Sequence, residues 1–158
     1  MNHNELISFY EKRRSNYAAQ LISINKKIYL ISNLRLATAL ASLVFIYFTF
    51  TNASFFYVAL PLLVTFALLV RRHSKLFSEK IHLENLITIH KHELQGLTGD
   101  ISCFMNGSEF LDLHHPYTHD LDIFGDGSLF QSVNRCNTLQ GKKELANRLS
   151  RPLGTADE

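Results

Sequence analysis

The clearest pattern in the chain is an uncharged stretch from Leu36 to Val70, from which Asp, Glu, Lys, Arg and His are all absent. One straight helix over this stretch would be about 50 Å long, whereas the hydrocarbon core of a bilayer is about 30 Å thick. A small polar run from Thr51 to Ser54 interrupts the apolar residues. The pattern therefore predicts a membrane hairpin over 36–70, with two short spans, roughly Asn33 to Phe50 and Ser54 to Val70, joined by a tight turn.

Basic residues flank the uncharged stretch on both sides, and the turn in its middle has none. They are Lys26, Lys27 and Arg35 before the stretch and Arg71, Arg72 and Lys75 after it. Positively charged loops stay on the cytoplasmic side of a membrane, so both termini are expected in the cytoplasm and only the turn on the far side. A helical pair buried in a soluble domain is the alternative, because each span is close to the lower length limit for crossing a bilayer.

Helical periodicity continues on both sides of the uncharged stretch. Apolar residues recur at spacings of three and four before it, at Leu6, Tyr10, Tyr17, Leu21, Ile24, Ile28 and Ile31, and in a second stripe after it, at Leu76, Leu83, Ile87, Leu94 and Leu97. This spacing is typical of coiled-coil seams and predicts two amphipathic cytoplasmic helices, over 1–35 and 71–98, that pack on each other. Gly96 and Gly99 are the expected stop of the second helix. Alternatively, each stripe packs against a molecule outside this chain.

Beyond Gly99 the helical period gives way to short apolar pieces and turn signals. We expect a connector over 99–127, with a turn at Asn106–Ser108. Two N-cap residues, Ser128 and Thr138, then predict two short helices. The first carries Leu129, Phe130 and Val133, and the second carries Leu145, Ala146 and Leu149 and is stopped by Pro152. Gly141 weakens the second helix, which predicts close packing at that position. The predicted fold class is therefore all-α.

Composition and motifs exclude several kinds of chemistry. The net charge of +2 is too small to indicate nucleic-acid binding by itself. Cys103 and Cys136 lack the spacing of metal ligands and are expected to be reduced thiols. An EF-hand is excluded, because Phe124 stands at the fifth position of the loop, where an oxygen ligand is needed, and Gln131 replaces the final bidentate Glu. No phosphate-binding loop is present. A metal-dependent enzyme that uses His115, His119, Asp120 and Asp122 is a third, separate hypothesis for the function.

The stretch from His115 to Leu153, about a quarter of the chain, resembles the start of the core domain in MutS-related proteins. It is most similar in layout to the membrane-anchored, MutS-like proteins of bacteria, in which helices precede this motif. The residues that carry the resemblance agree in order and spacing; they are His115, Pro116, Tyr117, Asp120, Asp122, Phe124, Gly125, Ser128, Phe130, Asn134, Arg135, Thr138 and Gly141.

The resemblance implies that 128–158 begins an all-helical core, which in that family joins DNA-contacting parts to an ATPase domain. Asp122, Phe124, Arg135 and Thr138 would then have structural roles as caps, packing anchors and charge pairs. The family's Walker A and Walker B motifs, signature helix and mismatch-reading domain do not occur in this sequence. We therefore predict no catalytic residue, cofactor-binding residue or metal ligand here, and we expect the chain to be the amino-terminal part of a longer protein.

The predicted function is a membrane-anchoring and coupling segment of a MutS-like, ATP-dependent, DNA-associated protein of the bacterial inner membrane. This segment is not expected to be an enzyme. Its expected partners are membrane lipid, the remainder of the core and ATPase, and a second copy in a homodimer. ATP and magnesium would bind only to the missing ATPase domain, and DNA only through the parent protein. The alternative is a small helical membrane protein whose cytoplasmic coiled arms oligomerise or recruit a partner, without any role on DNA.

Overall fold

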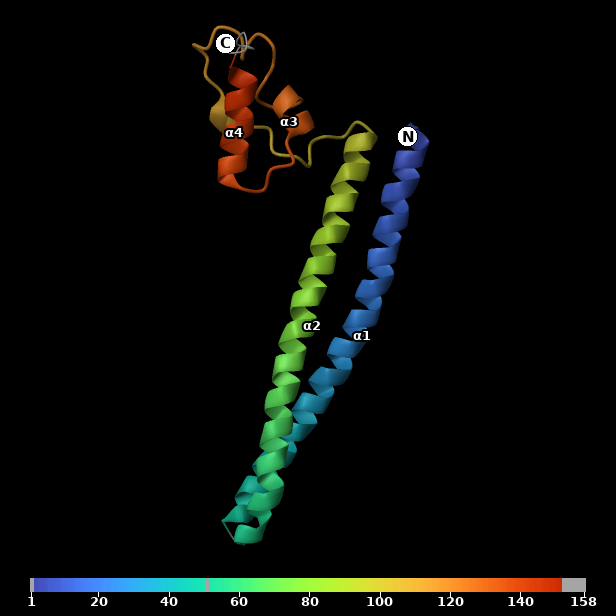
Figure 1. Ribbon diagram of the computed structural model, residues 1–158, viewed down its shortest axis with the longest axis vertical. Coiled ribbons are helices and arrows are strands. Elements are labelled where there is room, and N and C mark those ends of the chain that lie inside the picture. Colours follow the sequence, from blue (N-terminus) through green and yellow to red (C-terminus); the bar gives the residue numbers. More distant parts are fainter. Residues whose placement is uncertain (1, 51, 152–158) are drawn as a thin grey trace, which may run out of the picture. The chain divides into compact units, whose positions relative to one another are not determined.

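The computed structural model describes residues 2–50 and 52–151, and every regular element in these ranges is helical (Figure 1). The predicted all-α class is thereby confirmed for the described residues. The elements are α1 (His3–Thr49), a 3-10 turn η1 (Ala53–Phe55), α2 (Phe56–Leu97), a 3-10 turn η2 (Ser108–Phe110), α3 (Leu129–Val133) and α4 (Leu139–Ser150). Contacts divide the chain into two compact units, residues 11–90 and residues 1–10 with the part that follows residue 90.

The predicted first arm and first span form one uninterrupted helix, α1. No glycine or proline occurs in its 47 residues, so nothing in the sequence breaks the helical hydrogen bonds. The hydroxyl groups within its apolar half donate to carbonyl oxygens of the preceding turn, as Thr38 does to Arg35 and Thr49 to Phe45, each at 2.9 Å. These hydroxyls therefore need no water partner.

The turn between the long helices is slightly longer than predicted. Helix α1 ends at Thr49 and α2 begins at Phe56, instead of at Phe50 and Ser54. The amide nitrogen of Ser54 donates to the side-chain oxygen of Asn52 at 3.0 Å, and this local bond holds the chain in the 3-10 turn before α2. Thr51 lies outside the described residues.

The long helices lie side by side and run in opposite directions within residues 11–90. Residues of the two helices come together in the order expected for this arrangement: the rings of Tyr17 and His90 have centroids 5.4 Å apart, Ile31 and Leu76 line one hollow, and Ile46 and Leu63 line another. On α2, Leu76 and Leu83 of the predicted stripe are buried and Ile87 is half-buried; His90, which the sequence placed as a polar interruption of this stripe, is buried as well. The stripe of the first arm from Tyr17 to Ile31 is half-buried.

Helix α2 ends in a hydrogen-bonded stop at Gly99, as the sequence predicted. Gly99 has a φ of +92°, the amide nitrogen of Asp100 donates to the carbonyl of Gln95 at 3.0 Å, and that of Gly99 donates to the carbonyl of Gly96 at 3.1 Å. Together these bonds form a Schellman motif. Gly96 itself lies inside the last turn of the helix, and there a Cβ atom would stand 3.1 Å from the ring of Phe104.

The unit that follows residue 90 is built around one aromatic cluster. The rings of Phe110, Phe124 and Phe130 have centroids 5.5 to 6.0 Å apart, and Ala146, Leu145, Leu149 and Ile123 complete the core. Phe110 and Phe124 come from the predicted connector, so 99–127 is part of this core and not a simple linker. Helices α3 and α4 start at the predicted N-caps, where the hydroxyl oxygen of Ser128 accepts from Gln131 at 3.2 Å and that of Thr138 accepts from Gly141 at 3.1 Å. Pro152, the predicted stop of the last helix, lies outside the described residues.

Candidate functional site

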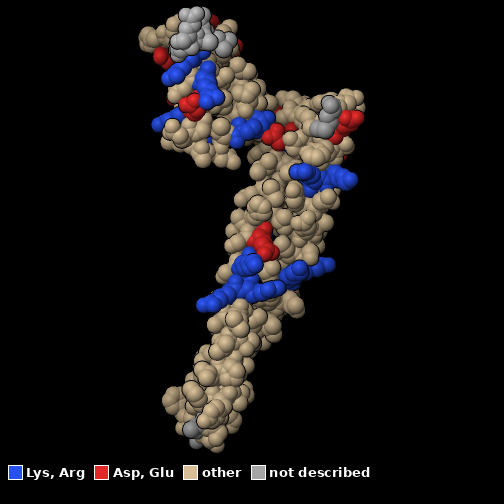
Figure 2. Space-filling view, viewed as in Figure 1, with Lys and Arg blue, Asp and Glu red and all other residues tan. Residues whose placement is uncertain are grey.

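The outward face of the uncharged half of α1 and α2 is apolar. Both helices have the length and composition to cross a membrane, and only 6% of each apolar window is buried inside the structure. A core helix of a soluble protein would have most of such a window covered. The large exposed side chains on this face include Leu40, Leu43, Val44, Tyr47, Tyr57, Val58, Leu60, Val64 and Leu68. In Figure 2 this end of the unit has no acidic or basic side chain.

The contact face between these halves consists partly of small residues. Ser42 is 3% exposed and Ala59 is 4% exposed, and they are the buried positions among the residues of the uncharged stretch whose side chains the structure describes. The hydroxyl of Ser42 donates to the carbonyl of Thr38 within its own helix. Small residues between helices and large apolar residues outside are the arrangement that packing in lipid favours, since lipid gives no hydrophobic force between helices.

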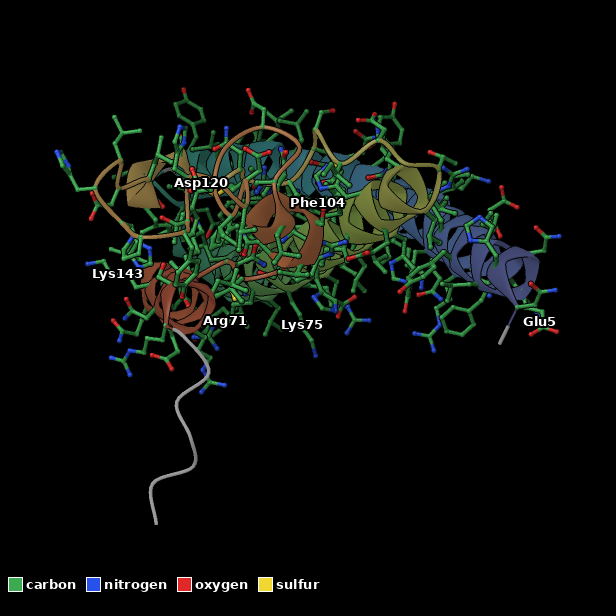
Figure 3. The ribbon with its side chains drawn as sticks, turned by 90° about the horizontal axis from the view of Figure 1, so that it is seen from above. Glu5, Arg71, Lys75, Phe104, Asp120 and Lys143 are labelled. Atoms are coloured by element: carbon green, nitrogen blue, oxygen red, sulfur yellow. The ribbon has the colours of Figure 1, made fainter. Side chains whose placement is uncertain are left out.

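A band of basic side chains lies where the uncharged halves end. Figure 2 shows these side chains as a blue belt, and in Figure 3 Lys75 extends outward from the ribbon. The basic residues at this boundary are Lys26, Lys27, Arg35, Arg71, Arg72 and Lys75. The acidic residue Glu79 lines a hollow between the two helices together with three of these cations, Lys27, Arg72 and Lys75. A positive belt beside an apolar surface is the charge pattern of the cytoplasmic boundary of membrane proteins.

Buried amide side chains hold the stretch 104–106 in the C-terminal unit. The side-chain nitrogen of Gln131 donates to the carbonyl of Phe104 at 2.8 Å, and its oxygen accepts from Gly127 at 2.7 Å. Asn134 donates to the carbonyl of Met105 at 3.4 Å and accepts from Cys136 at 2.9 Å. Each side-chain amide thus pairs with one backbone carbonyl and one backbone N–H group. Buried backbone groups require such hydrogen-bond partners.

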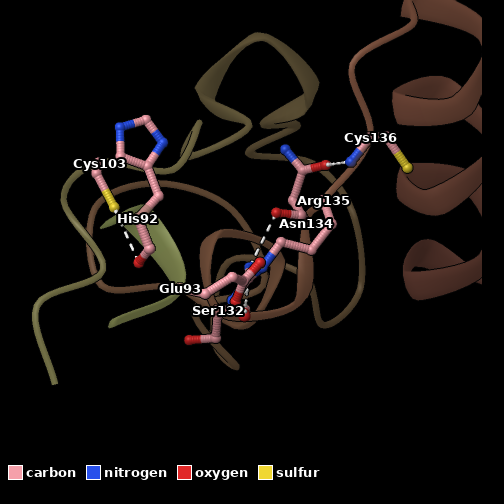
Figure 4. A network of polar contacts seen from close by, with 7 residues as sticks. All are labelled: His92, Glu93, Cys103, Ser132, Asn134, Arg135 and Cys136. Atoms are coloured by element: carbon pink, nitrogen blue, oxygen red, sulfur yellow. Dashed lines mark hydrogen bonds and ion pairs between the residues drawn. The ribbon is translucent and has the colours of Figure 1, made fainter. Parts of the chain in front are cut away.

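Arg135 joins the last turns of α2 to this unit (Figure 4). Its Nε donates to Glu93 at 2.7 Å, its Nη1 donates to the carbonyls of Ser132 and Asn134 at 3.0 Å each, and its guanidinium lies 3.6 Å from the ring centroid of Phe104. Because the pair with Glu93 is partly exposed, we assign it no more than about 1 kcal/mol. Arg135 therefore acts mainly through geometry, as it fixes α2, Phe104 and the end of α3 to one another.

The first motif residues close the other end of the unit. The Nδ1 atom of His115 accepts from the amide nitrogens of Tyr117 and Thr118 at 3.4 Å, so its Nε2 carries the proton donated to the carbonyl of Ser150 at 3.0 Å. The rings of His115 and Tyr117 meet edge to face with centroids 4.6 Å apart. His115 thus ties the connector to the last turn of α4.

The remaining motif residues have different surroundings. Asp120 and Pro116 are exposed, and Asp122 takes a positive φ of 47° while its carbonyl accepts from Leu129 at 3.2 Å. Gly125 has a φ of +112° and donates to the carbonyl of Asn106. Close packing at Gly141 is confirmed, since a Cβ there would stand 3.0 Å from the Thr138 hydroxyl. Within the described residues, no group of three or more His, Cys, Asp or Glu side chains has the placement to hold a metal ion.

The pKa of Asp100, in the turn after α2, is lowered by two hydrogen bonds from Ser102. The hydroxyl of Ser102 donates to its carboxylate at 2.6 Å and the Ser102 amide nitrogen at 3.1 Å, and these bonds lower the pKa of Asp100 below its usual value. A lowered pKa means that the stabilisation is present at neutral pH and is lost as the pH falls through the folded-state pKa. This turn after α2 is therefore firmest near neutral pH.

The sequence did not indicate that Glu93, Asn106 and Gly107 help to assemble the unit that contains the motif. The Asn-Gly dipeptide was a turn signal, but nothing in it indicated that the Asn106 carbonyl accepts from Gly125 at 2.9 Å. Glu93 is 42 residues from Arg135, and no local pattern connects them. Comparisons with known protein families, curated proteins and solved structures gave no match to this chain. The resemblance to MutS-related proteins therefore depends on the residues from His115 onward.

Proposed function

We propose that this chain is a membrane anchor that couples the cytoplasmic membrane to a helical unit in the cytoplasm. The observation that carries this proposal is the apolar outward face of residues 36–70, which is left uncovered in the structure and ends at a basic belt. In this proposal α1 and α2 cross the bilayer as a hairpin, and both termini remain in the cytoplasm. The belt keeps the charged halves of the helices on that side.

The coupling function follows from the position of α2. Its residues 56–90 belong to the anchor, and its residues 91–97 pack into the unit that contains the family motif. Arg135 and Glu93 form the bond between that helix end and the motif. By the resemblance, the motif continues into a MutS-like core and ATPase in a longer parent protein, which the anchor would tether to the membrane. ATP, magnesium and DNA would bind only to that parent.

The topology can be tested with single thiols. In a background without the native thiols (Cys103→Ser, Cys136→Ser), Asn52→Cys places a thiol in the turn between the spans, whereas Ser15→Cys and His114→Cys place exposed thiols on the arm and the C-terminal unit. We expect a membrane-impermeant maleimide to label position 52 in intact spheroplasts, and positions 15 and 114 only after lysis. Labelling of position 52 only after lysis, or recovery of the chain in the soluble fraction, would contradict the anchor.

The self-associating alternative is favoured by apolar side chains on the cytoplasmic arm of α2. Phe77 and Ile81 lie one turn apart and are 47% and 45% exposed, so they form an outward apolar strip beyond the predicted membrane. A second copy or a partner helix would cover this strip.

The size of the native protein separates the two functions. An immunoblot of membrane and soluble fractions, made with an antibody against this chain, should show a membrane band several times heavier than 18.1 kDa if the chain anchors a MutS-like ATPase. A membrane band at 18.1 kDa would leave no ATPase to anchor and would put the self-associating hairpin first.

A further inference from the structure

A hollow lies between α1 and α2 at the level of the basic belt. It measures about 290 Å³ and is lined by Lys27, Leu30, Ile31, Arg72, Lys75, Leu76 and Glu79. Both helices contribute to it, and all seven residues belong to the unit of residues 11–90. Its lining therefore combines three cationic side chains, three aliphatic side chains and the carboxylate of Glu79.

The cations of this hollow have no partner within the part of the chain that the structure describes. The ion pairs there are Lys80 with Glu84, His114 with Asp112, Arg135 with Glu93, and Arg148 with Glu144. Lys27, Arg72 and Lys75 are in none of them, and no ion pair connects them to Glu79. Three cations against the single carboxylate of Glu79 leave an excess of positive charge at the hollow, which attracts an anion from the surroundings.

The depth of the hollow relative to the uncharged stretch indicates which anion this is. Arg72 and Lys75 follow Val70 by two and five residues, or about 3 and 8 Å along a helix, whereas Lys27 precedes Leu36 by nine residues, or about 14 Å, and approaches the hollow from the water side. A lipid headgroup layer extends about 5–8 Å beyond the hydrocarbon core on each side, so Arg72 and Lys75 lie at the level of lipid phosphates. The aliphatic walls of Leu30, Ile31 and Leu76 fit the glycerol and upper acyl carbons of a lipid, for which a free phosphate ion has no counterpart.

We infer that this hollow binds the phosphate headgroup of one anionic phospholipid from the cytoplasmic leaflet. Arg72 presents a planar fork of donors to the phosphate oxygens, while Lys27 and Lys75 act as point charges from the two helices. Since Lys27 comes from α1 and the other two cations from α2, one bound lipid would connect the two helices. The inference rests on the proposed membrane insertion, and it adds a specific ligand at the boundary.

The chain offers a closely matched control for a test. Lys26 and Arg71 are the sequence neighbours of Lys27 and Arg72, belong to the same belt and are exposed as well, but do not line the hollow. The variants Lys27→Gln/Arg72→Gln and Lys26→Gln/Arg71→Gln have the same net charge and the same depth. They differ only in the direction in which the two lost charges face, because successive helical residues point about 100° apart.

The experiment is a calorimetric titration of the full chain in dodecylmaltoside micelles with dihexanoyl-phosphatidylglycerol. We expect one saturable site per chain, affinity about tenfold or more weaker in Lys27→Gln/Arg72→Gln, and a change below about twofold in Lys26→Gln/Arg71→Gln. Dihexanoyl-phosphatidylcholine and inorganic phosphate are titrated in parallel and should bind at least about tenfold more weakly, since each lacks either the net charge or the glycerol and acyl groups. Far-UV circular dichroism verifies that both variants keep the helix content of the parent chain.

Equal losses in the two double variants would show diffuse surface attraction and overturn the site. Inorganic phosphate that binds as tightly as the short-chain lipid would overturn the lipid as ligand. These failures are distinguishable from failure of the anchor itself, because the thiol labelling of position 52 reports insertion independently. A chain that inserts correctly but shows no difference between the variants would keep the anchor and lose the lipid site.

Discussion

Replacement of Phe130 with alanine is expected to destabilise the C-terminal unit by about 3–5 kcal/mol, which is the usual cost for removal of a fully buried aromatic ring. Phe130 has no exposed surface and touches both other rings of the cluster, with centroids 5.6 Å from Phe110 and 5.5 Å from Phe124. A unit with so few buried residues has a small free energy of unfolding, so a loss of this size is a large part of it. We therefore expect its cooperative structure to be lost.

Native-state hydrogen exchange of the full chain in micelles measures this effect. The amides of Phe130 and Asn134, which donate to Ile123 and Phe130, should lose their protection in Phe130→Ala. Leu129→Ala is the matched control, since its side chain is 47% exposed and its loss should change protection by less than about 1 kcal/mol. Unchanged exchange in Phe130→Ala would show that the aromatic cluster is not the core.

Substitution of Gly107 with alanine is expected to cost about 3 kcal/mol, from two separate causes. Gly107 has a φ of +71°, at which a Cβ costs about 1–2 kcal/mol. A Cβ there would also stand 2.5 Å from Cδ1 of Phe130, so the ring must move within its packed cluster, at about 1–3 kcal/mol.

Gly127 separates these two causes. Its φ of +75° is nearly the same, but no side chain lies within 4 Å of a Cβ at that position. Gly127→Ala should therefore show only the backbone cost, again as the change in exchange at Phe130 and Asn134. If Gly107→Ala and Gly127→Ala destabilise the unit equally, the close approach of residue 107 to the Phe130 ring does not contribute.

Local signals predicted the helices well. The three-four spacing of apolar residues placed the stripe from Tyr17 to Ile31 on one face of α1, and the Ser128 and Thr138 hydroxyls marked the starts of α3 and α4. Each of these signals depends on contacts between residues three or four apart. The two long apolar helices were predicted in the same way, from a run of residues that has no charge.

The contacts that assemble the candidate site could not be predicted in this way. Gln131 reaches back 27 residues to the carbonyl of Phe104, and Arg135 reaches back 42 residues to Glu93. An amide or guanidinium on a short helix is equally compatible with exposure to water, and its partner depends on how the connector folds. The same holds for one of the two requirements for glycine at position 107, because the close approach of its backbone to the Phe130 ring arises only when the connector folds against α3.

The less exposed face of α2, which forms its seam with α1, restricts how the helix pair can change in length. Among the less exposed positions of α2, a series from Ala59 to His90 follows alternating steps of three and four, a repeat of 3.5 residues, and Val70 and Leu86 lie directly beside it. Because an undistorted helix has 3.6 residues per turn, the two helices keep facing each other only by winding in a left-handed sense. An added or deleted heptad leaves each seam side chain on its face, whereas a change of three or four residues locally overwinds or unwinds the pair. Length variation of the pair is therefore limited to whole heptads, and in the proposed anchor this limit would set how far from the bilayer the ends of the pair can lie.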